Sequence, residues 1–79
     1  MSIRHFRIFI AVAEEENITK AAKKLYLTQP TVSVAIKEIE EHYAARFFER
    51  INQRLRITEE GKRFLDYAKH FIAMYDEME

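Results

Sequence analysis

The 79-residue chain has no cysteine and no tryptophan, and it has only one glycine and one proline. The absence of cysteine excludes disulfides and thiolate metal sites. A single glycine excludes the glycine-rich loops that hold phosphate groups in nucleotide-binding enzymes. No segment approaches the roughly 20 apolar residues of a membrane span, and the N-terminus lacks the apolar run and cleavage site of a signal peptide. We therefore expect a soluble, cytoplasmic protein with no membrane partner.

Arrangements of catalytic or metal-binding residues are also missing. His5, His42 and His70 lie far apart without ligand spacing, and no nucleophile motif occurs. The acidic run Glu14–Glu16 has no histidine or cysteine nearby, which predicts a solvated helix end rather than a metal site. We expect no enzymatic activity, no bound metal and no cofactor.

Charged residues are present in equal numbers of each sign but are unevenly distributed. The formal net charge is zero, which argues against nucleic acid, since most nucleic-acid-binding domains are basic. However, residues 17–37 contain four lysines and no acid, and Arg50, Arg54 and Arg56 follow with no acid between them. Such segregation can create a positive face on a neutral molecule.

Helix-capping residues divide the first half of the chain. Ser2 predicts the start of a helix with Phe6 and Phe9 in the core, and Asn17 predicts a second, short helix. Thr28 predicts a third helix, in whose first turn Pro30 is tolerated. Two helices joined by a tight turn predict a helix-turn-helix over residues 18–37; an ordinary helical hairpin is the alternative.

The third helix, expected to end between Tyr43 and Ala45, has two different faces. The helical repeat places one apolar stripe, expected to be buried, at Val32, Ile36, Ile39 and Tyr43. Val34 points the other way, either as an isolated surface residue or as a contact for a thymine methyl group. Gln29 and Ser33 lie near it, where they could hydrogen-bond base edges.

Two short strands are predicted between the third helix and the last. Phe47 or Phe48 begins the first strand, Leu55 and Ile57 alternate in the second, and Asn52-Gln53 forms the turn. Arg54 and Arg56 would then lie on the exposed side of a hairpin wing. Surface arginines are usually only solvated, but beside a helix-turn-helix they are well placed for phosphates or the minor groove.

Thr58 predicts the start of a last helix about 30 Å long, too long for so small a domain to cover. Its first half, with Phe64 and Leu65, is expected to pack on the core. A heptad stripe predicts contact with a second subunit. A membrane-surface helix is disfavoured because the polar face ends acidic. The predicted dimer interface comprises Phe64, Ala68, Phe71, Ile72, Tyr75 and Met78. We divide the chain into a DNA-binding domain at 1–58 and a linker helix at 59–79.

Together these motifs resemble the N-terminal DNA-binding domain of LysR-type transcriptional regulators, from Ile3 to beyond Gly61. The resemblance implies a mainly α, winged helix-turn-helix fold with a three-helix core, a β-hairpin wing and a long dimerisation helix. The matching residues are Phe9, Val12, Ala13 and Glu14; Thr19, Ala21, Ala22 and Leu25; Thr28, Gln29, Pro30, Val32, Ser33, Ile36, Ile39 and Glu40; Phe47, Phe48 and Arg50; and Leu55, Ile57, Thr58 and Gly61.

The resemblance implies a sequence-specific regulator that binds double-stranded DNA at a pseudo-palindromic site as a homodimer, with higher oligomers in the full-length protein. A winged-helix module that binds protein instead of DNA is the alternative. Family members continue into an effector-binding domain, so we expect this chain to be the DNA-binding part of a longer regulator. The expected DNA contacts are Thr19, Lys20, Thr28, Gln29, Pro30, Thr31, Ser33, Val34, Lys37, Arg50, Asn52, Gln53, Arg54 and Arg56.

The sequence departs from the family pattern at three places. Glu16-Asn17 replaces the more usual Gly-Ser before the second helix, and Ala44 replaces the glycine that commonly ends the third helix. The wing tip, Ile51-Asn52-Gln53, has no glycine.

Overall fold

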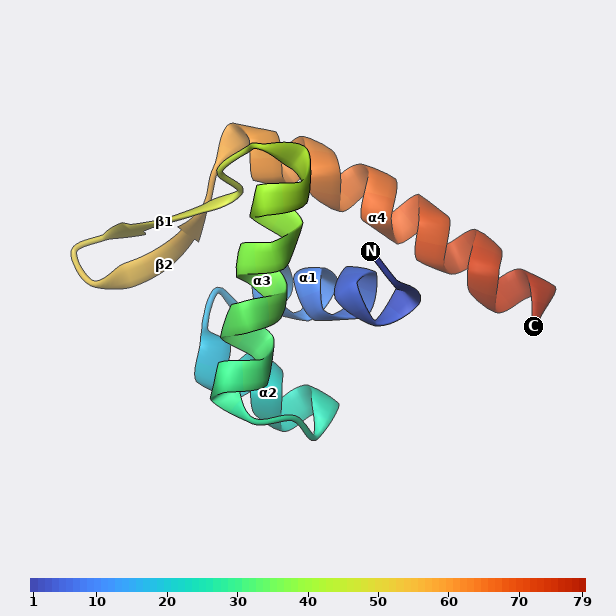
Figure 1. Cartoon of the computed structure of the whole chain (residues 1–79), viewed down its shortest axis with the longest axis horizontal. Helices are drawn as coiled ribbons and strands as arrows, with labels where there is room; N and C mark the ends of the chain where they lie inside the picture. Colours follow the sequence, from blue (N-terminus) through green and yellow to red (C-terminus); the bar gives the residue numbers. More distant parts are fainter.

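Four helices and one antiparallel hairpin make up the computed structural model, which describes all 79 residues. In chain order these are α1 (Ile3–Glu15), α2 (Ile18–Leu25), α3 (Gln29–Tyr43), β1 (Phe48–Ile51), β2 (Arg54–Ile57) and α4 (Glu59–Met78). The hairpin projects from one side of α3, and α4 extends to the opposite side past α1 (Figure 1). The predicted winged helix-turn-helix followed by a long helix is confirmed.

Each helix begins at the residue that the sequence predicted as its cap. The side chains of Ser2, Asn17, Thr28 and Thr58 each accept a hydrogen bond from the backbone N–H three residues further along. These bonds satisfy one of the N–H groups that have no partner within the helix. The helix starts are therefore set by local chemistry.

An aromatic cluster around Phe9 joins α1, the start of the wing and α4. The Phe9 side chain is fully buried, and its ring centroid lies 4.7 Å from Phe64, 5.1 Å from Phe48 and 5.5 Å from Phe47. Edge-on and tilted aromatic pairs of this kind stabilise the fold by more than the burial of their apolar surface alone. The cluster fixes the base of the hairpin relative to the helices.

The predicted buried stripe of α3 is correct for three of its four residues. Val32, Ile36 and Ile39 are buried, but Tyr43 is 43 % exposed, so its assignment to the core was wrong. Tyr43 is the last residue of α3, and its ring contacts His42 at 4.7 Å and Phe64 at 5.0 Å without being enclosed.

Five residues that are not glycine adopt left-handed backbone conformations. Glu16, Tyr26 and Ala44 end the first three helices with φ values of 48°, 58° and 50°. Asn52 and Gln53 have φ values of 52° and 64°, the pattern of a type I′ hairpin turn. A left-handed conformation costs ordinary residues about 1–2 kcal/mol, so these positions carry backbone strain.

Two packing details hold the hairpin against α3 and α4. The Glu40 carboxylate accepts hydrogen bonds from the N–H groups of Phe47 and Phe48, at 2.6 and 3.1 Å. A side chain at Gly61 would overlap the carbonyl oxygen of Phe47 and the side chain of Ile57. The only glycine of the chain therefore allows α4 to pack closely against the wing.

The acidic run Glu14–Glu16 ends α1 with partly exposed side chains, as predicted, and it also contacts neighbouring elements. The carboxylate oxygens of Glu14 and Glu15 lie 3.3 and 3.6 Å from Lys24 Nζ, and Glu16 contacts β2. Because α2 and β2 both come close to the end of α1, the acids of this run form contacts between elements.

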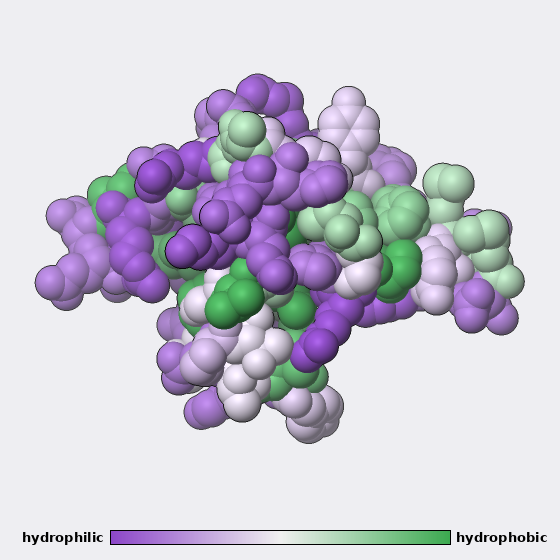
Figure 2. Space-filling model, in the orientation of Figure 1, coloured by the Kyte–Doolittle hydropathy of each residue, from purple (hydrophilic) through white to green (hydrophobic).

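The predicted heptad stripe of α4 divides between the interior and the surface. Ala68 is fully buried in the single chain, and Phe64 packs in the aromatic cluster. Phe71 packs against Phe6 of α1, with the rings tilted and their centroids 4.7 Å apart, yet stays 43 % exposed. The apolar side chains left exposed are Tyr67, Phe71, Met74 and Met78, which we call the outer stripe of α4. Figure 2 shows hydrophobic side chains gathered along this end of the molecule, while hydrophilic ones cover most of the wing.

Candidate nucleic-acid interface

The exposed face of α3 is polar except for one valine. Gln29, Pro30, Ser33 and Lys37 are exposed, and Val34 is 54 % exposed among them. The opposite face is buried, so Val34 belongs to the surface. No acid occurs on α3 before Glu38, so its first two turns present donors, a methyl-bearing side chain and no negative charge.

Thr28 and Thr31 are more constrained than the other predicted contacts on this helix. The Thr28 hydroxyl oxygen accepts from the Thr31 N–H at 3.3 Å and lies 2.8 Å from the Thr31 hydroxyl. Their first role is to cap α3, and Thr31 is only partly exposed. The capping fixes the start of the helix and therefore the position of Gln29.

A polar recess brings together predicted contacts from three separate segments. It lies between the start of α2, the start of α3 and the wing. The predicted residues that line it are Thr19, Lys20, Gln29, Arg50, Gln53, Arg54 and Arg56. The N-terminal ends of two helices open onto it, and helix N-termini favour negative charge, although the acids Glu15 and Glu16 also line the recess. Asn52, at the wing turn, is exposed beyond the recess.

Ion pairing separates the cations of the chain into two groups. Lys24 pairs with Glu14 and Glu15, and Arg56 lies 3.5 Å from Glu16. By contrast, several cations near α3 form no salt bridge, namely Arg4, Lys20, Lys37, Arg46, Arg50 and Arg54. These unpaired charges can meet an external anion without first losing an internal partner.

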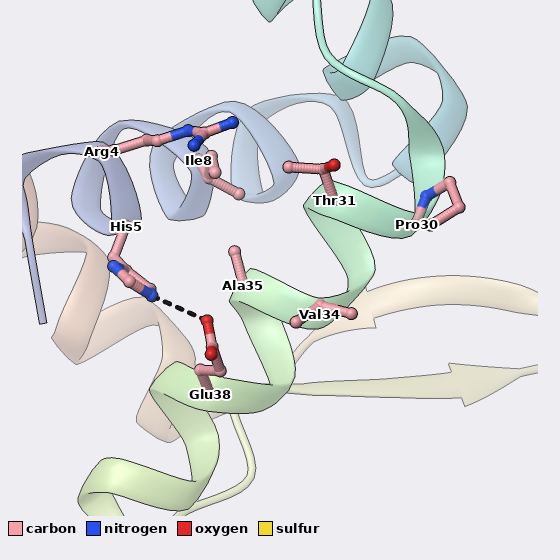
Figure 3. Close-up of a pocket in the computed structure, with 8 residues that line it drawn as sticks. All are labelled: Arg4, His5, Ile8, Pro30, Thr31, Val34, Ala35 and Glu38. Atoms are coloured by element: carbon pink, nitrogen blue, oxygen red, sulfur yellow. Dashed lines mark hydrogen bonds and ion pairs between the residues drawn. The ribbon is translucent and has the colours of Figure 1, made fainter.

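Two of the unpaired cations were missed in the sequence. Arg4 of α1 lines a hollow beside Pro30, Thr31 and Val34 (Figure 3). Arg46, before β1, lines a shallow hollow with Lys37. Both arginines lie outside the acid-free stretches of the sequence, residues 17–37 and 50–56. Only the fold brings them to the sides of α3.

The end of α1 that carries Arg4 is attached to α3 by a side-chain hydrogen bond. His5 Nε2 lies 3.0 Å from Glu38 Oε1 (Figure 3). His5 Nδ1 also lies 2.9 Å from the Ser2 hydroxyl, within the capping box of α1. These contacts hold the first turn of α1 beside the exposed face of α3.

No group of three histidine or acidic side chains could hold a metal ion.

The pKa of Arg7 is raised and the pKa of Asp76 is lowered, in both cases mainly by the hydrogen bond between them, which links α1 to α4 outside the recess. No helix has the length and apolarity needed to cross a bilayer.

Comparisons with family models and with individual proteins point to the same family. The family described as "Bacterial regulatory helix-turn-helix protein, lysR family" matches residues 3–62. The uncharacterised HTH-type transcriptional regulator YxjO of Bacillus subtilis is 41 % identical over 75 residues, covering 95 % of this chain and 26 % of that protein. The HTH-type transcriptional regulator BenM of Acinetobacter baylyi is 40 % identical over 78 residues, covering 99 % of this chain and 26 % of BenM.

Solved structures agree with the sequence comparison. The crystal structure of the BenM DBD/catB site 1 DNA complex superposes with a TM-score of 0.93 at 40 % identity, covering 99 % of this chain and 88 % of that one. The chain spans about a quarter of the length of the two curated regulators named above.

Proposed function

The chain belongs to the LysR family of bacterial helix-turn-helix regulators and has the DNA-binding fold of that family, and from this premise we propose that it recognises a specific sequence in double-stranded DNA. The observation that carries the proposal is the exposed, acid-free start of α3, flanked by unpaired cations. We also propose a cytoplasmic location, since chromosomal DNA is the proposed ligand. The relatives are transcriptional regulators, not enzymes.

In the proposed complex, the first turns of α3 enter the major groove. Gln29 can form a bidentate hydrogen bond with adenine, and Ser33 can bond to a neighbouring base edge. Val34 would contact a thymine methyl group, which explains an apolar residue on this face. Lys37, about two turns after Gln29, would reach a base or a phosphate.

The wing and the flanking cations would bind the DNA backbone. Arg50 and Arg54 carry no internal ion pair, so they are available for phosphates or the minor groove. Lys20, at the start of α2, lies in the same recess. Arg4 and Arg46 would contact phosphates on either side of α3. Such contacts fix register and orientation but carry no sequence information.

We propose that two chains associate through the outer stripe of α4. Tyr67, Phe71, Met74 and Met78 recur at intervals of four, three and four and remain exposed in one chain. A stripe of this kind favours helix pairing. The two α3 helices of the dimer would then read the two halves of a pseudo-palindromic site. In this arrangement residues 1–58 bind DNA and residues 59–79 join the subunits. The whole protein would form higher oligomers.

Selection of bound duplexes from a random library tests this function. We expect enrichment of inverted half-sites whose centres are separated by about 10–10.5 base pairs or a multiple. Gel shifts at two salt concentrations should show binding that weakens steeply as salt rises. If the folded chain enriched no sequence and bound no duplex at low salt, the chain would instead be a protein-interaction module.

The wing is tested by Arg54→Ala. We expect a modest loss of affinity that is equal on selected and random duplexes, because a phosphate contact does not read sequence. The slope of log affinity against log salt should become shallower by about 0.9. Arg63→Ala, which removes an unpaired arginine on α4 outside the recess, is the matched control. An unchanged slope for Arg54→Ala would place that residue off the DNA.

A further inference from the structure

Glu16 joins the corner between α1 and α2 to the second strand of the wing. Its Oε2 accepts a hydrogen bond from the Ile57 N–H at 3.1 Å, and its Oε1 lies 3.5 Å from Nη1 of Arg56. One carboxylate therefore contacts the backbone of one residue and the side chain of its neighbour. Glu16 and Arg56 both line the polar recess.

The Ile57 amide needs a partner from outside the hairpin. Thr58 donates its N–H to the carbonyl of Phe47 across the ladder. Since hydrogen-bonded pairs alternate along an antiparallel ladder, the N–H of Ile57 points away from β1. Ile57 is partly buried, where an unsatisfied amide is costly. Glu16 supplies the missing acceptor and anchors β2, as Glu40 anchors the start of β1.

The backbone at Glu16 shows that this contact has a cost. Glu16 is left-handed, with a φ of 48°, a conformation that favours glycine. Glycine would adopt this conformation without penalty, but it has no side chain to accept from Ile57. Strained residues persist when the surrounding contacts require them. The contact with β2 is the feature that a glycine could not supply.

We propose that Glu16 is a positioning residue for the wing and that it holds Arg56 away from the DNA backbone. This rests on the proposed function. An exposed ion pair contributes little to stability, but moving Arg56 to a phosphate would leave the Glu16 carboxylate unpaired beside a polyanion. Arg56 therefore stays with Glu16, and Arg50 and Arg54 provide the phosphate contacts of the wing.

A double-mutant cycle with Glu16→Gln and Arg56→Ala tests this assignment. Glutamine keeps an acceptor for the Ile57 N–H but removes the charge. The salt dependence of binding is measured for all four proteins on a selected duplex and on a random one. We expect Arg56→Ala alone to weaken binding on both duplexes, because the Glu16 carboxylate is then unpaired beside the DNA, and to change the slope by much less than about 0.9, because no phosphate contact is lost. In the Glu16→Gln background, Arg56→Ala should make the slope shallower by about 0.9, because the released arginine has reached a phosphate.

Equal slope changes from Arg56→Ala in both backgrounds would overturn the proposal, since Arg56 would then be on a phosphate already. No change in either background would also overturn it, since Arg56 would not reach DNA at all. Failure of the wild-type chain to bind any duplex would instead contradict the proposed function.

Hydrogen exchange of the Ile57 amide tests the positioning role without DNA. We expect protection in the wild type and in Glu16→Gln, and exchange about fivefold faster or more in Glu16→Gly, where no side chain can accept the bond. Circular dichroism should show that all three proteins fold, because glycine suits the left-handed backbone at this position. Equal exchange of Ile57 in the wild type and Glu16→Gly would overturn the proposal whatever the DNA results.

Discussion

At the scale of single residues, the left-handed positions are of two kinds. Glu16 offsets its backbone strain through its contacts with β2. Ala44 has only a methyl group, which is exposed, and its backbone N–H forms the hydrogen bonds that end α3. Replacing Ala44 by glycine would therefore remove few contacts, whereas replacing Glu16 by glycine would remove the anchor of the wing.

Ala44→Gly should stabilise the fold. The left-handed conformation costs alanine about 1–2 kcal/mol, a cost that glycine does not have. The more flexible unfolded state of the glycine variant offsets about 0.5–1 kcal/mol of this stabilisation. We expect the free energy of unfolding, measured by urea denaturation, to rise by roughly 0.5–1 kcal/mol.

The neighbouring Ala45→Gly is the matched control, because Ala45 does not have a positive φ and packs against the core. This variant should lower the free energy of unfolding. A loss of stability in Ala44→Gly similar to that in Ala45→Gly would contradict the account of strain.

Residue-level predictions from the sequence succeeded where the chemistry is local. The four caps each act over three residues, so they could be recognised without the fold. The pairing of Arg56 with Glu16 joins residues 40 positions apart, and no local pattern predicts it. Which cations are free for DNA therefore became visible only in the structure.

At the scale of elements, α4 is attached to α1 near both of its ends. Phe64 enters the aromatic cluster, and Asp76 forms an ion pair with Arg7 of α1 at 2.5 Å. The helical period predicted which residues of α4 share a stripe, but it could not show that α1 covers part of that stripe. This is why Ala68, predicted at a dimer interface, is fully buried in one chain.

The attachment of the end of α4 should depend on pH. The hydrogen bond from Arg7 lowers the pKa of Asp76, so the ion pair stabilises the fold above the unfolded pKa of about 3.9. Its contribution is lost as pH falls through the lower, folded pKa. We expect Asp76→Asn to speed hydrogen exchange in the last two turns of α4 at pH 7, and the difference from wild type to vanish once Asp76 is protonated.

Glu77→Gln, in the same turn but without a salt bridge, should leave this exchange unchanged at both pH values. A difference between Asp76→Asn and wild type that persisted in acid would show that the ion pair is not its cause.

At the scale of the whole molecule, two unlike surfaces lie at different ends. The polar recess lies beside the start of α3 and the wing. The outer stripe of α4 lies towards the C-terminus, where Figure 2 shows hydrophobic side chains. The composition, with zero net charge, did not predict this separation. It follows from the order of the elements, which places the wing and the end of α4 on opposite sides of α3.

Met74→Glu should weaken association without unfolding the chain. Met74 is 62 % exposed in one chain, so glutamate there costs the monomer little, but it would place a charge within the proposed helix pair. Sedimentation equilibrium should show at least a tenfold higher dissociation constant, which corresponds to about 1.4 kcal/mol.

Ala73→Glu adds the same charge on the neighbouring, polar side of α4 and should leave association unchanged. Equal effects of the two variants would exclude the outer stripe as the dimer interface.

The central claim is that the exposed start of α3 reads DNA sequence, and the affinity of Gln29→Ala on a selected and a random duplex tests it most directly. We predict a loss of about 1–3 kcal/mol on the selected duplex and little change on the random one. Gln53→Ala, which removes an exposed glutamine at the wing turn, should affect both duplexes equally. Equal losses for Gln29→Ala on the two duplexes would contradict the claim.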